Sequence, residues 1–247
     1  MAKSVSSKFF TWDGHRLSRF TMSVQADFSR NFADGTCYED NAVDEVPGVM
    51  VREFVTKGAS AGAYEFEALE KLAGDGSGPF ILPMFGSTAH GAAVVVQDAR
   101  LKTASLLGAR DALSPFDLSF STLGDWLTGQ IFLESLTGAP TGAGTANSAG
   151  IELGAAPLGV WLAVNAVDIP GITGTSPTLT VILQSDVDDT WASPADIITI
   201  SSITDIPDGV LVLDTDAITD TFFRVQVVVG GTSTPTYPLQ IAAGKLA

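Results

Sequence analysis

The sequence lacks the residue types that usually build metal and redox sites. It contains one cysteine and two histidines in 247 residues. Cys37 has no partner for an internal disulfide and no cysteine-rich pattern beside it, so we interpret it as an incidental thiol. His15 and His90 lie far apart, and neither has a Cys, His or carboxylate at ligand spacing. Phosphate-binding glycine loops are also missing. We therefore expect no metal, no cofactor and no enzymatic activity.

Long hydrophobic runs are absent as well. No window reaches the run of about 18 apolar residues that a membrane span requires, although 45% of the residues are apolar and only 17% are charged. The positive mean hydropathy of +0.28 then indicates buried strands. The N-terminal residues 1–14 have no apolar stretch before Trp12, so we expect no secretory signal, synthesis in the cytoplasm and no membrane partner.

Basic residues are scarce in the second half of the chain. Residues 1–137 carry 11 Lys and Arg against 17 Asp and Glu, whereas residues 138–247 carry 2 against 11. Between Arg110 and Arg224 there is no Lys or Arg, so this stretch cannot neutralise phosphates. Specific nucleic-acid binding by the second half is disfavoured. The net charge of −15 favours solubility and repels polyanions.

Three patterns resemble catalytic or metal sites without completing one. Gly58–Gly62 has the G-x-S-x-G spacing around Ser60, but the alternating β-strand and helix units of a hydrolase are missing. Asp186–Asp189 resembles part of a calcium loop, yet it lacks the glycine at position six and the glutamate at position twelve. The two carboxylate pairs, Glu39 with Asp40 and Asp44 with Glu45, have no apolar residues around them that would raise the pKa of a carboxyl group. We interpret all three as structural turns or solvated loops.

A connector divides the chain. Thr137–Gly150 contains four Gly, one Pro and no charged or large apolar side chain, so it cannot offset its ordering entropy by packing. We expect a first domain at 1–136, a flexible linker at 137–150 and a second domain at 151–247. The predicted fold class is mainly β, with an α+β first domain whose sheet forms a sandwich or barrel, and an all-β, immunoglobulin-like second domain.

The first domain has one predicted helix and six or seven predicted strands. Alternation from Phe20 to Phe28 indicates a half-buried strand, and the acidic segment Asn31–Gly48 is expected to be a projecting loop before a second strand at Val49–Val55. Ala63–Ala73 has the apolar spacing and terminal charges of a helix. Further strands are expected in the following segments: Pro79–Phe85, Ala92–Val96, Arg100–Ala109, Pro115–Ser121 and Thr128–Leu133.

Strands in the second domain are short and evenly spaced. They are rich in Val, Ile, Leu and Thr, and turns containing Gly, Pro or Asp separate them, which is typical of a β-sandwich. The expected strands are Leu158–Val167, Thr178–Ser185, Asp196–Ser201, Gly209–Leu213, Thr221–Val229 and Thr236–Ala242.

The chain resembles the major tail tube proteins of long-tailed, siphovirus-type bacteriophages that carry an added C-terminal β-sandwich. The resemblance covers nearly the whole chain and is one of pattern. It rests on the turn and strand at Trp12–Phe20, the acidic loop ending at Val46–Gly48, the helix at Ala63–Ala73, the late strands within Ala92–Leu133, and the stretches Gly174–Gln184 and Asp189–Trp191.

The resemblance implies a structural virion protein that forms hexameric rings, which stack into the tail tube that conducts viral DNA. It implies self-association and contacts with tape measure, terminator and distal tail proteins, while DNA passes through the lumen without specific binding. Assembly in the host cytoplasm and location in the virion tail follow. The family's long loop and N-terminal arm contact neighbouring subunits, which carries over to the following residues: Phe9, Phe10, Phe32, Asp34, Tyr38, Glu39, Asp40 and Val46.

Two other functions remain open from the residues. The chain could be a binding module that decorates a capsid or adheres to a host, although the sandwich has few aromatic residues at its turns, with Trp191 and Tyr237 as the candidates for stacking on a glycan. It could also be a hydrolase that uses Ser60. Electron microscopy separates the first alternative from the tube, and a Ser60→Ala variant tests the second.

Overall fold

The computed structural model describes a set of segments of this chain. The described residues are 11–16, 21–34, 45–60, 77–84, 87, 89–106, 114–135, 144–167, 173–204, 206 and 208–247. The predicted helix at Ala63–Ala73 lies outside them. Among the described residues, no helix is long and apolar enough to cross a membrane. The chain is mainly β, as the sequence predicts.

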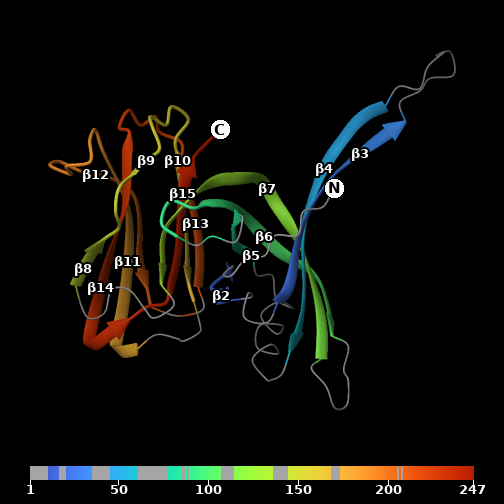
Figure 1. The fold of residues 1–247 in the computed structure, drawn as a ribbon, viewed down its shortest axis with the longest axis horizontal. Helices are drawn as coiled ribbons and strands as arrows, with labels where there is room; N and C mark the ends of the chain where they lie inside the picture. The colour runs from blue at the N-terminus through green and yellow to red at the C-terminus, as the bar shows by residue number, and fades with distance from the viewer. Residues whose placement is uncertain are drawn as a thin grey trace. The chain divides into compact units, whose positions relative to one another are not determined.

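Two sheets contain the described strands (Figure 1). Sheet A includes ten strands, in the order β13-β10-β15-β7-β6-β5-β1-β2, with β4 pairing with β7 and β3 pairing with β4. Sheet B includes five strands, in the order β12-β11-β14-β8, with β9 also pairing with β14. The strands of the first half are β1 (Thr11–Trp12), β2 (His15–Arg16), β3 (Thr21–Asp34), β4 (Glu45–Ser60), β5 (Ser77–Pro83), β6 (Ala93–Leu106) and β7 (Ser114–Ser135). The strands of the second half are β8 (Gly144–Asn147), β9 (Ile151–Glu152), β10 (Val160–Ala166), β11 (Thr173–Asp186), β12 (Ala195–Ile203), β13 (Asp208–Asp214), β14 (Phe222–Thr236) and β15 (Leu239–Lys245).

The chain forms two compact units, which we call unit 1 and unit 2. Unit 1 contains Met1–Val5, Thr21–Gly76 and Arg100–Leu123, whereas unit 2 contains Ser6–Phe20, Ser77–Ala99 and Gly124–Ala247. The sequence predicts a different division, at 1–136, 137–150 and 151–247. The structure also places β8 inside the predicted connector, where it pairs with β14. Small residues there are compatible with a strand because backbone hydrogen bonds to β14 need no large side chain.

Strands β6 and β7 are each longer than predicted. The sequence suggests two strands within each, separated near Ala99 and Gly124, but each is one continuous strand. The division between units 1 and 2 falls at these same two positions. Turn-forming residues therefore mark the places where a strand passes from one unit to the other.

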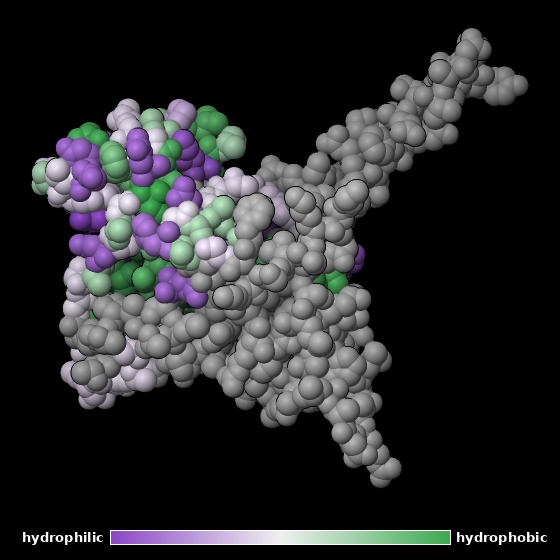
Figure 2. All heavy atoms as spheres, in the orientation of Figure 1, coloured by the Kyte–Doolittle hydropathy of each residue, from purple (hydrophilic) through white to green (hydrophobic). Residues whose placement is uncertain are grey.

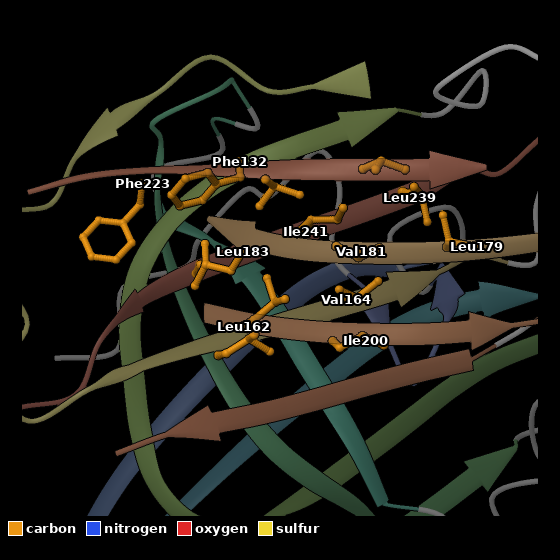
Figure 3. Packing of buried hydrophobic residues seen from close by; sticks show 14 of the residues in the cluster. Phe132, Leu162, Val164, Leu179, Val181, Leu183, Ile200, Phe223, Leu239 and Ile241 are labelled. Atoms are coloured by element: carbon orange, nitrogen blue, oxygen red, sulfur yellow. The ribbon is translucent and has the colours of Figure 1, made fainter. Parts of the chain in front are cut away.

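The core of unit 2 lies between sheet B and the strands β10, β13 and β15 of sheet A. Alternate residues of β10, β11, β14 and β15 point into it, and they are almost entirely buried (Figure 3). Leu162 and Val164 of β10, together with Ile241 of the neighbouring strand β15, face Leu183 of β11 across this core (Figure 3). Two facing sheets with alternating inward side chains form a β-sandwich.

The opposite face of β10 lines a second core of unit 2. Its buried members come from β5, β6, β7, β10 and β15, and they are Ile81, Val94, Val96, Ile131, Trp161, Ala163 and Ala242. Because β10 and β15 are buried on both faces, they read as continuous apolar runs. Close packing requires two glycines: a side-chain carbon on Gly129 or Gly244 would collide with the Trp161 ring.

The hairpin of β1 and β2 belongs to unit 2. Asp13 and Gly14 form its two-residue turn with φ values of 47° and 73°, the geometry that Asp-Gly adopts in tight hairpins. Trp12 is 1% exposed, and its Nε1 donates to the Ala99 carbonyl oxygen at 2.9 Å. Asp13 also lies against Gly209 of β13. The N-terminal hairpin thus packs beside β13 and β10, far along the chain.

Candidate assembly surfaces

The predicted contact loop is partly a continuation of the β3–β4 hairpin. Phe32 is in register with Pro47, and Asp34 with Glu45, whereas the sequence predicts a loop over all of Asn31–Gly48. Strand pairing therefore continues about four residues further on each side, so the hairpin projects as a two-stranded ribbon (Figure 1). Pro47 is tolerated because a proline can occupy a strand position where no N–H is needed.

The structure brings three of the eight predicted contact residues to one place. Phe32 and Asp34 of β3 lie at the same end of the hairpin as Val46 of β4, which is in register with Ala33. The other five predicted contact residues lie outside the described residues. These are Phe9, Phe10, Tyr38, Glu39 and Asp40.

Unit 1 presents two strand edges, which sequence reasoning did not identify. Its described strands follow the order β3-β4-β7-β6, with β4 paired to β7 from Glu53 to Ser60. Among the described residues, β3 pairs with β4 only. On the other side, the seven-residue β5 can cover at most half of the 14-residue β6. The part of β6 after Ala99 therefore forms the second edge of unit 1 within the described strands.

Among the described residues, the candidates Ser60, His15 and His90 are not brought together. Ser60 lies in β4, in register with Ser114, rather than on a turn that would expose a nucleophile. His15 is 3% exposed and stacks on Trp12, with ring centroids 5.9 Å apart. His90 is exposed, and its Nε2 lies 3.0 Å from the Ala149 carbonyl oxygen. Each histidine therefore contacts neighbouring residues of the fold, His15 through its ring and His90 through its Nε2 atom.

The calcium-like segment at 186–189 is a hydrogen-bonded turn. Asp186 accepts from the backbone N–H groups of Val187 and Ser193. The hydroxyl and the backbone N–H of Thr190 donate to Asp188 and lower its pKa below the usual value of 3.8. Among the described residues, no group of three His, Cys, Asp or Glu could hold a metal ion. These carboxylates shape the turn.

A buried polar network ties the N-terminal hairpin into unit 2. Asn165 of β10 is fully buried, and its Nδ2 donates to Thr11 Oγ1 at 2.5 Å and to the Pro79 carbonyl oxygen at 3.1 Å. Its Oδ1 accepts from the Gly14 N–H at 3.3 Å, and Thr11 Oγ1 donates to Gln240 Oε1 at 2.6 Å. The sequence signal was available: an asparagine within the apolar run WLAVNAV requires buried partners.

Comparisons with known proteins add weak likenesses to solved structures. No family model and no curated protein matches the sequence. The SPP1 Dit protein, described as a paradigm of the hub adsorption apparatus in phages that infect Gram-positive bacteria, shares 12% identity and a TM-score of 0.38, over 97% of this chain and 99% of that chain. A chain in the virion of a native gene transfer agent shares 12% identity and a TM-score of 0.34, over 44% of this chain and 84% of that one. A chain in the tail of an empty gene transfer agent particle, with C6 symmetry, shares 12% identity and a TM-score of 0.33, over 44% and 81%. Scores this low carry no inference about this chain.

Proposed function

We propose that this protein is a structural subunit of a viral tail, and that it polymerises into stacked rings that form the tail tube. The observation that supports the proposal is the order of the described strands in unit 1, which ends at β3 on one side and at β6 on the other. A long open edge presents a row of unpaired N–H and C=O groups and pairs readily with another strand. The sequence resemblance to tail tube proteins supports the same function.

The two edges are different surfaces, so their pairing is head-to-tail. When β3 of one copy pairs with β6 of the next, the contact is heterologous, and such contacts close into a ring if the rotation fits. A closed ring leaves no free edge because the sheets of all copies join in one barrel. We expect six copies. The hairpin end with Phe32, Asp34 and Val46, the loop with Tyr38, Glu39 and Asp40, and the arm with Phe9 and Phe10 would contact neighbouring copies.

The charge supports a passive conduit for DNA. A net charge of −15 gives a surface that repels the phosphate backbone, so DNA would slide through without specific binding. We expect the other partners to be the tape measure, terminator and distal tail proteins, with the assembled protein in the virion tail after assembly in the host cytoplasm. We expect no enzymatic activity.

The proposal is tested by interrupting the β3 edge while leaving the hairpin intact. Successive N–H groups along β3 point alternately towards β4 and away from it. Of the two variants Gln25→Pro and Ala26→Pro, one therefore removes an N–H that faces β4, and the other removes an N–H on the open edge. Hydrogen exchange of β4 amides identifies which is which.

Sedimentation and electron microscopy of the wild-type protein should show rings and stacked tubes. The variant that retains β4 protection should remain monomeric, because proline blocks the added strand. If this variant forms rings as the wild type does, the edge-pairing proposal is wrong. Wild-type monomers or trimers at every concentration would instead favour a capsid-decoration or host-adhesion module.

A further inference from the structure

Two short segments of the second half are built from Thr, Ser, Gly and Pro alone. They are Thr173–Thr178, with the sequence TGTSPT, and Gly231–Thr236, with the sequence GTSTPT. Each contains four residues with a hydroxyl group among its six, and neither contains a charged residue. Segments rich in Ser and Thr together with Pro are typical of proteins that carry O-linked sugars.

The structure brings the two segments side by side, although they lie far apart in the chain. The first begins β11 and the second ends β14. Thr173 is in register with Thr236, and Thr175 with Thr232. The hydroxyls of Thr173 and Thr236 are hydrogen-bonded at 2.7 Å. The two segments therefore form a single two-stranded surface, which we call the hydroxyl ribbon.

Glycine and proline fix the shape of the hydroxyl ribbon in a reciprocal way. Gly174 of the first segment lies against Pro235 of the second, and Gly231 of the second lies against Pro177 of the first. A Cβ on either glycine would lie within 3.0 Å of the Cα of that proline. Both glycines have a positive φ, of 100° and 112°, which favours glycine. The two segments therefore hold each other in place.

Four hydroxyl groups of the ribbon are accessible. Their residues, which are exposed, are Thr175, Ser176, Thr178 and Thr232. Within the described part of the chain, these four hydroxyls have no hydrogen-bond partner. Figure 2 shows pale spheres of intermediate hydropathy at the lower left, where Figure 1 places the start of β11 and the end of β14. The ribbon thus presents a cluster of unengaged hydroxyl oxygens to solvent.

The ribbon extends beyond its neighbours in sheet B. The described pairs between β11 and β12 begin at Leu179, and those between β14 and β8 end at Val229. Within the described strands, the ribbon is therefore only two strands wide, with an outer edge on each side. Proteins commonly cover or interrupt such edges, because an uncovered edge pairs with other chains. Bulky polar groups attached to the ribbon would cover these edges.

The charge of this half of the chain favours a neutral group over a phosphate. Residues 138–247 carry 2 Lys and Arg against 11 Asp and Glu. A phosphate adds about 1.5–2 negative charges and is stabilised where Arg side chains can pair with it. The hydroxyl ribbon contains no basic residue. A sugar adds bulk and hydroxyl groups without adding charge.

We propose that the hydroxyl ribbon is a site of O-linked glycosylation, with Thr175, Ser176, Thr178 and Thr232 as the acceptors. A hydroxyl oxygen forms a bond to the anomeric carbon of a nucleotide-activated sugar, and the bond from that carbon to the phosphate breaks. The nucleoside diphosphate leaves with the bonding electron pair. The hydroxyl proton passes to a general base, which a separate glycosyltransferase supplies.

Mass spectrometry of the full chain, purified from the cells or particles in which it is naturally made, tests the proposal. Cleavage before Asp and after Arg or Lys places the two halves of the ribbon in peptides 168–185 and 225–245. Fragmentation that keeps O-linked groups attached should locate hexose or N-acetylhexosamine on the four acceptors. Peptide 196–204 is the control, because Thr199 and Ser201 are exposed on β12 without a neighbouring proline, and it should be unmodified.

Three results would overturn the proposal. These are ribbon peptides without any sugar, equal modification of peptide 196–204, and phosphate in place of sugar. Sugars confined to the ribbon peptides would support it.

A variant without the four hydroxyls provides a second test. It combines Thr175→Val, Thr178→Val and Thr232→Val with Ser176→Gly, because Ser176 has a φ of 47° and glycine accepts that conformation. The intact protein should lose the added mass completely, whereas Thr199→Val with Ser201→Ala should keep it. Circular dichroism checks that both variants fold. Retention of the full added mass by the variant without the four hydroxyls would contradict the assignment.

This inference does not depend on assembly into a tube. Sugars on the ribbon of a protein that never forms rings would support the modification and refute the tube. Rings built from a protein whose ribbon carries no sugar would refute the modification and leave the edge pairing of unit 1 in place.

Discussion

Replacing Asn165 by alanine tests whether the N-terminal hairpin is a structural part of unit 2. The side chain of Asn165 is fully buried and hydrogen-bonds to Thr11, Pro79 and Gly14. After Asn165→Ala, the Pro79 carbonyl oxygen still accepts from the Asp13 N–H at 3.2 Å, and Thr11 still donates to Gln240. The Gly14 N–H is the group that loses its acceptor.

The expected loss of stability follows from these contacts. A buried donor without an acceptor costs about 1–3 kcal/mol, and the small cavity left by the missing amide adds about 1 kcal/mol. We expect the free energy of unfolding of unit 2 to fall by about 2–4 kcal/mol. Asn147→Ala is a matched control because Asn147 is exposed on β8 and accepts one hydrogen bond, from Gln226; such a surface change should cost less than about 0.5 kcal/mol.

Urea unfolding measures the loss of stability in the two variants. Hydrogen exchange in peptides from β10 and from the β1–β2 hairpin shows which segments lose protection. In Asn165→Ala, residues 11–16 should lose protection together with β10, at a lower urea concentration than in the wild type. Equal midpoints for Asn165→Ala, Asn147→Ala and the wild type would refute the argument that this buried network holds the hairpin in unit 2.

Three further predictions concern packing and titration in unit 2. Truncation after Leu136 removes β10 and β15, and each buried apolar side chain of the second core that becomes exposed to water costs about 1.5–3 kcal/mol of stability. Circular dichroism and limited proteolysis should show that the truncated chain does not fold in this region. A stable fragment that still assembles would contradict this. Gly129→Ala should lower stability by about 1–3 kcal/mol, because its Cβ would lie 2.5 Å from the Trp161 ring, and an unchanged thermal midpoint would contradict the packing. The Asp188 carboxylate should titrate below 3.8 in an NMR titration, so that its stabilising effect is complete above pH 3.8 and is lost as the pH falls through the lowered pKa; Thr190→Val should raise this pKa towards 3.8, and no change would exclude the hydroxyl as the cause.

The sequence predicts the strands of the second half well. Each of the six strands expected between Leu158 and Ala242 corresponds to an observed strand, because alternating or continuous β-branched runs between Gly, Pro and Asp turns are a local signal. The turn at Asp13 and Gly14 is confirmed for the same reason. Local chemistry decides these elements.

Long-range relations were not predictable from local patterns. In the sequence, β6 and β7 each look like two separate strands because of the turn-forming residues near Ala99 and Gly124, yet each is one continuous strand. The position of the N-terminal hairpin in unit 2 depends on distant partners, since Trp12 bonds to Ala99, 87 residues away, and Thr11 bonds to Asn165, 154 residues away. Periodicity shows that a strand has a buried face, but it does not show which strand covers that face.

The candidate assembly surfaces could be predicted only in part, because they too depend on long-range strand pairing. The sequence placed contact residues on a loop at Asn31–Gly48, and the structure extends strand pairing to Asp34 and Glu45. That β3 and β6 are the outermost described strands of unit 1 could not be read from the sequence, since the position of a strand in a sheet is not marked by a motif. The predicted contact residues outside the described part of the chain remain predictions.

The central claim, that unit 1 joins copies through the edges of β3 and β6, is tested most directly by a cryo-electron microscopy map of the assembled protein. The account predicts rings in which β3 of each copy lies hydrogen-bonded beside β6 of its neighbour, in one continuous sheet. A protein that stays monomeric at all concentrations, or rings in which β3 pairs with β4 alone and the copies meet through other surfaces, would contradict it.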